Sequence, residues 1–466
     1  METSNTLDSR CVTAPESLWQ DRLHKGIWPE PLSLWMAVFW LALFIIRPWE
    51  VLFPELEPLH VERVWALLTV AVVFGSGKLR LCNSFQTTAV IVFLLALGFS
   101  SMFAGDHAAA REVLYKYVTL VVFYFILLSV IRTPYQLLFI GSCYIVVMAL
   151  YLGKAQFEYF VHGHCQYRMG VSRLAGIEST FGHPNSVASS AVLSLPILYF
   201  LWRFRRDFTR TWPDLWRNLF PWGLAVYFWL AVSSIVLTNS RSGMLGFVLF
   251  IFLSATAGKP FRRILPAVVV GGVLLAGVWG VMPEENKNRL RTVWDPAAGP
   301  ANAQESTQGR IEGFKAGLEM FRRHPLAGVG IGSFVPYRLA HVDNVPLRAH
   351  NMVGELLGET GLIGCGAFIL FVSGVFVNCR ATNRLAGQYC HPAVDMLSEL
   401  AITWRNTIWL LLFMGLSGHN LLRFNWLWAA AFVLLCRMFS EAACAEEELV
   451  RDEEHELCER EIPWTH

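Results

Sequence analysis

Apolar runs of about 20 residues recur along almost the whole chain, and they constrain its fold more than any other feature. A helix needs about 20 mostly apolar residues to cross the hydrocarbon core of a membrane. About twelve such runs are present. They lie near residues 32–52, 60–77, 86–104, 112–131, 134–153, 184–203, 219–238, 241–257, 264–282, 352–378, 401–418 and 424–440. The predicted fold class is therefore an all-α, polytopic membrane protein of about twelve transmembrane helices.

The composition agrees with this fold class and excludes several functions. Hydrophobic residues make up 54% of the 466 residues and charged residues only 16%, whereas a soluble domain carries about 25% charged residues. The formal net charge of +2 gives no reason to expect a nucleic-acid partner. The ten cysteines form no CxxC pair, and neither an HExxH motif nor a P-loop is present. We therefore predict no metal site and no cofactor.

The lysines and arginines of the short loops predict the orientation in the membrane. Counted from an inner N-terminus, the inner loops are rich in these residues, as in 203–217 and 259–263, and the short outer loops carry few. Both termini are therefore expected on the cytoplasmic side. Residues 1–31 form a cytoplasmic segment without the features of a signal peptide, and residues 441–466 form an acidic cytoplasmic tail.

Two outer loops are long, and only the longer one is large enough to form a soluble domain. They cover residues 154–183 and 283–350. The second loop separates transmembrane helices 1–9, within residues 32–282, from helices 10–12, within residues 351–440. We expect residues 283–350 to form a small helical domain on the outer side.

This outer domain contains clear helix and turn signals. A helix is expected to begin near Ser306 or Thr307, either of which can cap it, and to end at His324-Pro325. The turn after it is predicted to be flexible because it contains three glycines, Gly328, Gly330 and Gly332.

His350 stands where the outer domain enters the apolar run 352–378. On a helical wheel it lies near four glycines, which would let another helix approach closely. These are Gly354, Gly358, Gly361 and Gly364. A neutral histidine at this place can accept a proton from a hydroxyl nucleophile. The alternative is an interfacial histidine that caps a helix or hydrogen-bonds a neighbour.

Arg241 lies between two apolar runs on the outer side, in the sequence Asn239-Ser240-Arg241-Ser242-Gly243. Asn239 or Ser240 can cap the following helix, whose free N–H groups and dipole attract anions. An arginine in that first turn adds a guanidinium group suited to phosphate oxygens. The alternative is an arginine that only extends toward the membrane surface.

Arg310 repeats this pattern, because it follows Ser306 and Thr307 near the expected helix start. Two arginines at helix N-termini on the same side can hold a diphosphate. A salt bridge to Glu312 or a solvated position are the alternatives for Arg310.

Four further residues are candidates for supporting roles. Arg168 and Arg173 lie just before Gly182-His183-Pro184-Asn185. They either add positive charge to an outer cleft shared with Arg241 and Arg310 or are only exposed loop residues. Glu355 and Glu359 follow His350 at the helix entrance, where an ionised carboxylate in lipid is costly. We expect them to pair with arginines or to orient the histidine, and a catalytic carboxylate role is secondary.

These segments resemble the bacterial O-antigen ligase and polymerase superfamily, in the order in which that superfamily carries them. They are residues 179–188 (STFGHPNSVA), residues 239–243 (NSRSG), Arg310 before a helix, residues 323–334 (RHPLAGVGIGSF), and His350-Asn351 with Gly361 and Gly364. The last segment is similar to the ligase pattern H-[NSQ]-x9-G-x-x-G. One departure is Phe314, where the superfamily often has a tryptophan.

The resemblance implies a GT-C-like, all-helical membrane glycosyltransferase in the bacterial inner membrane, with residues 283–350 as a periplasmic domain. It implies an undecaprenyl-diphosphate-linked glycan as donor, and lipid A core or another glycan as acceptor, without a nucleotide sugar or a metal. By the superfamily pattern, Arg241 and Arg310 bind the diphosphate. His350, with Asn351 beside it, is the base for the acceptor hydroxyl.

Three functions stay open at this stage. The histidine motif favours a ligase, and a polymerase that extends the lipid-linked glycan differs from it only in the acceptor. A transporter of a lipid-linked or anionic substrate would also explain the arginines. It would explain neither the outer domain ending in a histidine nor the lack of internal repeats.

Overall fold

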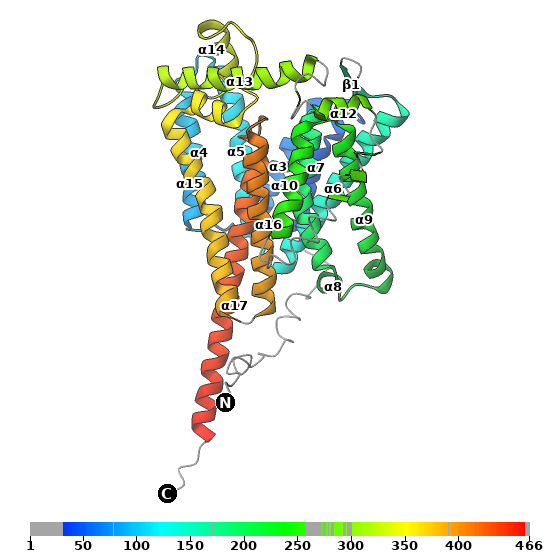
Figure 1. Ribbon diagram of the computed structural model, residues 1–466. Helices are drawn as coiled ribbons and strands as arrows, with labels where there is room; N and C mark the ends of the chain where they lie inside the picture. The colour runs from blue at the N-terminus through cyan, green and yellow to red at the C-terminus, as the bar shows by residue number, and fades with distance from the viewer. Residues whose placement is uncertain are drawn as a thin grey trace, which may run out of the picture.

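The fold is described by a computed structural model that covers residues 31–77, 79–168, 171–256, 272–273, 276–277, 279–280, 284–291, 295, 301–389 and 391–461. It is a bundle of long helices with a group of further helices and a small hairpin across one end (Figure 1). Among the described residues, seven helices are long and apolar enough to cross a membrane. The all-α, polytopic fold class predicted from the apolar runs is confirmed.

Each bundle helix overlaps one of the predicted spans, and several helices are longer than predicted. They are α2 (Leu32–Ile46), α3 (Val61–Gly75), α4 (Phe85–Ser101), α5 (His107–Val130), α6 (Pro134–Val161), α7 (Pro184–Arg203), α9 (Asp214–Leu237), α10 (Arg241–Thr256), α15 (Met352–Gln388), α16 (Pro392–Gly415) and α17 (Phe424–Glu461). The predicted span 264–282 lies largely outside the described residues. Three short elements join the bundle helices: η1 (Pro48–Glu50), η2 (Pro54–Leu59) and α8 (Arg205–Phe208).

Burial separates the inner helices from the outer ones. In their most apolar windows α7 and α17 are 78% buried, whereas α9 is 33% buried. Large apolar side chains on the outer face of α9, such as Trp222, Val226 and Trp229, are exposed. Because a membrane solvates such side chains, an apolar outer surface is expected for a spanning bundle.

The cap is formed by α12 (Glu284–Arg291), α13 (Ala301–Arg323) and α14 (Phe334–His341). Figure 1 shows α13 lying across the end of the bundle, with α14 beyond it. A two-stranded antiparallel hairpin, β1 (Cys165–Arg168) and β2 (Val171–Leu174), lies at the same end. The two long loops predicted for one side of the membrane therefore do lie at one end of the bundle.

The helix predicted in the cap ends where expected and begins earlier than expected. It ends at Arg323, just before His324-Pro325, but it begins at Ala301 instead of Ser306 or Thr307. Arg310 is therefore inside α13. The prediction that Arg310 lies at a helix N-terminus is wrong.

Glycines bring α13 and α15 into close contact. A Cβ atom on Gly354 would lie 3.1 Å from the Cα of Phe314, and one on Gly358 would lie 3.2 Å from the Cα of Gly317. On the α13 side, a Cβ on Gly317 would overlap the backbone of Gly354. The predicted glycine face at Gly354 and Gly358 is confirmed, and its partner is the cap helix that carries Arg310.

Gly361 departs from the helical wheel. Its φ is 60°, so it interrupts α15 instead of continuing the glycine face. The backbone groups around the break bond to the segment that follows α13. Leu362 and Ile363 donate their N–H groups to the carbonyls of Pro325 and Leu326, at 2.8 and 3.1 Å.

The glycine turn after α13 completes this junction. The N–H groups of Val329 and Gly330 donate to the carbonyls of Gly358 and Glu359, at 2.9 and 3.0 Å. Gly328 and Gly330 have positive φ values and lie directly against backbone atoms of α15 and of Ala104. The turn was predicted to be flexible. It is instead packed and hydrogen-bonded, because a break in a helix leaves backbone N–H and C=O groups that need partners.

Candidate functional site

His350 lies just before the first turn of α15 and has a left-handed backbone, with a φ of 48°. Asn351 caps the helix, because its Oδ1 accepts the N–H of Gly354 at 3.0 Å. Its Nδ2 donates to the carbonyl of Leu416 at 2.8 Å, which ties the start of α15 to the end of α16. The predicted alternative, a histidine that itself caps a helix, does not apply to His350.

A buried arginine orders the loop that leads to His350. Arg338 is only 1% exposed and forms a salt bridge with Asp343 at 2.6 Å. Its guanidinium also donates to the carbonyl of Leu347 at 3.2 Å. Since an unpaired buried charge is costly, these contacts fix residues 343–347 and so the approach of the chain to His350.

The His350 pocket is a cavity of about 280 Å³ at the capped end of the bundle. Helix starts and helix ends build it, so polar side chains dominate its wall. It is lined by His183, Asn185, Ser186, Ser189, Ser242, Arg348, His350, Met414, Ser417, Gly418, His419, Asn420 and Arg423.

Three histidines line this pocket, and the carboxylate of Glu355 lies beside one of them. The rings of His350 and His419 are 4.4 Å apart, centroid to centroid. Nδ1 of His419 lies 3.6 Å from a carboxylate oxygen of Glu355, slightly beyond hydrogen-bond distance. Both ring nitrogens of His419 and that oxygen are buried without a hydrogen-bond partner in the described part of the chain. His419 therefore lies in contact with both Glu355 and His350.

The surroundings keep His350 neutral. Burial, with the nearby His419, Arg310 and His183, lowers the pKa of His350 to about 4. Burial and the charges of Arg173, His419 and Arg310 lower the pKa of His183 to about 4 as well. A neutral imidazole can accept a proton. An anion bound beside it would raise its pKa, because a negative charge favours the imidazolium form.

Arg310 comes close to this pocket although it is not at a helix start. Its charge contributes to the lowered pKa values of both His350 and His183, so it lies within electrostatic range of both. Helix α13 positions it there through the glycine contact with α15. Arg310 does not line the pocket itself.

Arg241 is the first residue of α10, as predicted. Oγ of Ser240 accepts the N–H of Gly243 at 3.2 Å and so caps this helix. The next residue, Ser242, lines the His350 pocket, whereas Arg241 is not among the lining residues. The structure therefore brings the start of α10 to the pocket.

Arg173 connects the hairpin to two helices. It is 8% exposed, and it donates to the carbonyl of Thr238 and to Oδ1 of Asn185, both at 2.8 Å. These bonds hold the end of α9 and the start of α7, so Arg173 supports the turn before Arg241. Arg168 ends β1 opposite Val171, and its side chain lies outside the described part of the structure.

Glu359 has a different partner from the one predicted. It is 6% exposed, and its Oε1 accepts the backbone N–H of Phe334 at 3.0 Å. It forms no ion pair with an arginine among the described residues. Glu359 thus secures the start of α14 against α15, and the prediction that it pairs with an arginine or orients His350 is wrong.

Sequence reasoning missed His183 and His419 as members of this site. His183 caps α7, with Nδ1 accepting the N–H of Asn185 at 3.2 Å, and His419 follows the end of α16. One sequence feature is common to the three histidines of this site. His183-Pro184-Asn185, His350-Asn351 and His419-Asn420 each place a histidine and an asparagine together at the outer mouth of a helix.

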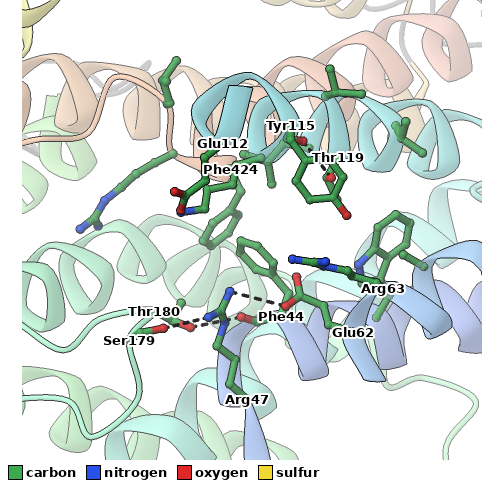
Figure 2. Close-up of a pocket in the computed structure, with 18 of the residues that line it drawn as sticks. Phe44, Arg47, Glu62, Arg63, Glu112, Tyr115, Thr119, Ser179, Thr180 and Phe424 are labelled. Carbon is green, nitrogen blue, oxygen red and sulfur yellow. Dashed lines mark hydrogen bonds and ion pairs between the residues drawn. The ribbon is translucent and has the colours of Figure 1, made fainter. Parts of the chain in front are cut away.

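A second and larger cavity, the amphipathic cleft, has a volume of about 960 Å³. Its walls come from α2, α3 and α5, with the 179–181 loop and residues 422–424 at one end (Figure 2). Apolar side chains such as Trp40, Val70 and Leu120 line it, together with several charged groups. Arg423 lines both this cleft and the His350 pocket.

No three His, Cys, Asp or Glu side chains are placed to hold a metal ion anywhere in the described ranges. The site thus consists of histidines, arginines and helix starts at the end of a membrane bundle. Fold and site define a polytopic membrane protein with a polar pocket beside an amphipathic cleft.

Comparison with known proteins finds similarity in part of the chain. A sequence model described as O-antigen ligase matches residues 226–369, from within α9 to the middle of α15. An O-antigen polymerase of Salmonella muenchen is 31% identical over 85 residues, which is 18% of this chain and 21% of that relative. The matches support the resemblance, carried by the motifs, to the O-antigen ligase and polymerase superfamily.

Proposed function

We propose that this protein is a membrane glycosyltransferase of the O-antigen ligase type. It moves a glycan from undecaprenyl diphosphate to an acceptor hydroxyl, on lipid A core or another glycan acceptor. The observation that carries the proposal is His350, which is neutral and lies within range of the charge of Arg310. Both residues fall inside the segment that matches the O-antigen ligase family.

In the proposed reaction, His350 accepts the proton of the acceptor hydroxyl while the hydroxyl oxygen bonds to the anomeric carbon. The bond from that carbon to the diphosphate oxygen breaks, and the electron pair leaves with undecaprenyl diphosphate. A single displacement of this kind inverts the anomeric centre. Arg310, Arg241 and the N–H groups at the start of α10 stabilise the negative charge that develops.

Donor binding and basicity are coupled in this scheme. The positive groups around His350 lower its pKa while the pocket is empty of anions. The bound diphosphate reverses that effect, because a nearby negative charge raises the pKa of an imidazole. His350 therefore becomes a stronger base when the donor is in place.

The proposed location follows from the loop charges and the superfamily. The protein spans the bacterial inner membrane with both termini cytoplasmic, and its cap and the His350 pocket face the periplasm. Neither a metal ion nor a nucleotide sugar takes part in the proposed reaction. Membrane lipid and the two glycan substrates are its partners.

The test is transfer by the purified protein. The protein in detergent is incubated with an undecaprenyl-diphosphate-linked glycan, with and without lipid A core, in the presence of EDTA. Glycan attached to the core supports a metal-independent ligase, and His350→Ala should abolish the product.

A polymerase is the second candidate, because the relative with 31% identity is named an O-antigen polymerase. Longer glycans on undecaprenyl diphosphate, formed without any core, would support it. Full activity of both Arg310→Ala and His350→Ala would contradict the proposed chemistry for either enzyme. The lack of any product with either acceptor would favour the transporter.

A further inference from the structure

Arg423 is placed between the two cavities and is not neutralised by a carboxylate. One guanidinium nitrogen lies 3.4 Å from Oγ of Ser190, and the guanidinium carbon lies 5.8 Å from the centre of the Phe181 ring. Within the described ranges it forms no ion pair with Asp or Glu. Burial lowers its pKa to about 10, so it remains charged at neutral pH. An arginine in this state is suited to an anionic ligand.

The other charges of the amphipathic cleft are partly neutralised. Arg47 forms an ion pair with Glu50 at 2.7 Å, and Lys116 forms one with Glu112 at 2.5 Å. Arg63 is different, since its guanidinium packs over the ring of Tyr115 at 5.4 Å and forms no ion pair in the part of the chain described. Figure 2 shows Arg63 reaching into the cavity. Arg63 and Arg423 are thus the cleft cations without a carboxylate in salt-bridge contact.

The remaining wall of the cleft is apolar. Trp40, Ala66, Leu67, Val70, Val118 and Val122 line it from the sides of α2, α3 and α5. A cavity of about 960 Å³ is at the upper end of the range for small-molecule sites. An apolar wall that also carries cations is complementary to a long hydrocarbon chain that ends in a phosphate.

A second apolar groove provides a contrast. It has a volume of about 1210 Å³ between α2, α6 and α9, and its lining includes Phe139, Ala149 and Trp216. None of its lining residues is charged. The hydrocarbon part of any membrane lipid suits that groove, whereas the amphipathic cleft also offers positive charge.

We propose that the amphipathic cleft binds the polyprenyl diphosphate part of the donor. One phosphate contacts Arg423 at the boundary with the His350 pocket, Arg63 adds positive charge inside the cleft, and the first isoprene units lie along α2, α3 and α5. Because Arg423 also lines the His350 pocket, a sugar attached to the terminal phosphate points toward His350. This inference rests on the proposed function and assigns a place in the structure to the lipid of its substrate.

The test measures binding of undecaprenyl diphosphate to the full chain in nanodiscs, independently of transfer. Arg423→Gln should weaken binding about tenfold or more, since a charge-assisted contact is lost. Arg423→Lys should weaken it less. Ala66→Trp, which fills the cleft, should also weaken binding about tenfold or more. Ala149→Trp makes the same change in the uncharged groove and should bind as the unaltered protein does.

Competing ligands identify what the cleft recognises. Inorganic diphosphate should compete only weakly because it lacks the chain, and phosphatidylglycerol only weakly because it lacks the diphosphate. Equal competition by phosphatidylglycerol would overturn the inference and indicate a general site for anionic lipids. Unfolding temperatures of the variants show whether a loss of binding comes from misfolding, and Arg63→Gln gives a second test of the charge.

Failure of the inference and failure of the proposed function give different results. If Ala66→Trp and both arginine variants bind the lipid normally while His350→Ala loses transfer, the cleft assignment is wrong and the enzyme stands. If the cleft variants lose binding but no acceptor receives glycan, the lipid site stands and the proposed reaction is wrong.

Discussion

The His350 pocket and the amphipathic cleft are neighbours that are built in opposite ways. The pocket, of about 280 Å³, is made by helix ends, and capping bonds hold His183 and Asn351, the neighbour of His350. The cleft, of about 960 Å³, is made by helix sides and has mainly apolar walls. Chemistry needs a few groups at fixed positions, whereas holding a chain needs mainly shape. This difference agrees with our proposals that proton transfer takes place in the pocket and lipid binding in the cleft.

His350→Ala should have the largest effect on the transfer rate, and it should leave lipid binding in the amphipathic cleft unchanged. Loss of a general base typically costs about 10²–10⁴-fold in rate, whereas lipid binding in the cleft should be unchanged. The measurement is initial-rate transfer beside binding of undecaprenyl diphosphate. His341→Ala, at the exposed end of α14, is the control and should leave both quantities unchanged. Retention of full transfer by His350→Ala would remove the pocket from the mechanism.

Arg310→Ala should have the next largest effect. Removing a group that stabilises developing charge costs about 10²–10³-fold, so the rate should fall more than the affinity for the donor. Arg310→Lys should recover part of the rate because it restores the charge without the planar guanidinium. Arg322, on the same helix, is 68% exposed and pairs with Glu319, so Arg322→Ala is the matched control. Similar rates for the two alanine variants would contradict the role of Arg310.

Gly317→Leu should disturb the pocket through packing. The new side chain would meet the backbone of Gly354 and push α13 away from α15. Overpacking of this kind costs about 1–3 kcal/mol, so the unfolding temperature and the transfer rate should fall together. Gly309 on the same helix has open space around its Cα. Gly309→Ala should therefore leave stability unchanged or slightly higher, and a loss equal to that of Gly317→Leu would refute the packing argument.

The pH dependence should give the smallest effect. The neutral form of His350 is the base, and it is lost as the pH falls through its pKa, which burial and positive neighbours lower to about 4. Between pH 7 and pH 5, kcat/KM for the donor should therefore change less than about twofold. Because bound diphosphate raises the pKa, kcat should begin to fall at a higher pH than kcat/KM. A kcat/KM profile that falls near pH 6.5 would show an unperturbed histidine.

The sequence was sufficient where a local pattern determines the structure. Apolar runs of spanning length predicted the bundle helices, and small residues at helical spacing predicted the face of α15 at Gly354 and Gly358 that α13 contacts. Ser240 was predicted as a cap and does cap α10. In each case, the sequence signal lies within one short stretch of the chain, or it follows from the length of helix that a membrane requires.

The sequence was insufficient where distant segments compete with a local signal. Ser306 and Thr307 are good capping residues, yet α13 begins at Ala301. Gly361 continues the glycine spacing, yet contacts from the segment after α13 hold it outside helical geometry. The sequence around Arg423 does not distinguish it from other loop charges, because its position between two cavities arises only from tertiary packing.

The junction at Gly361 also limits how the molecule can move. Four backbone hydrogen bonds fasten residues 325–330 to the break in α15, and α13 leads directly into that segment. The cap helix is therefore an extension of the membrane helix and not an independent lid. We therefore expect Arg310 and His350 to keep a nearly constant separation, and we expect a bulky acceptor to be admitted by movement of other walls of the pocket. In the proposed enzyme, the pocket would open around Arg310 and His350 while these two residues stay in place.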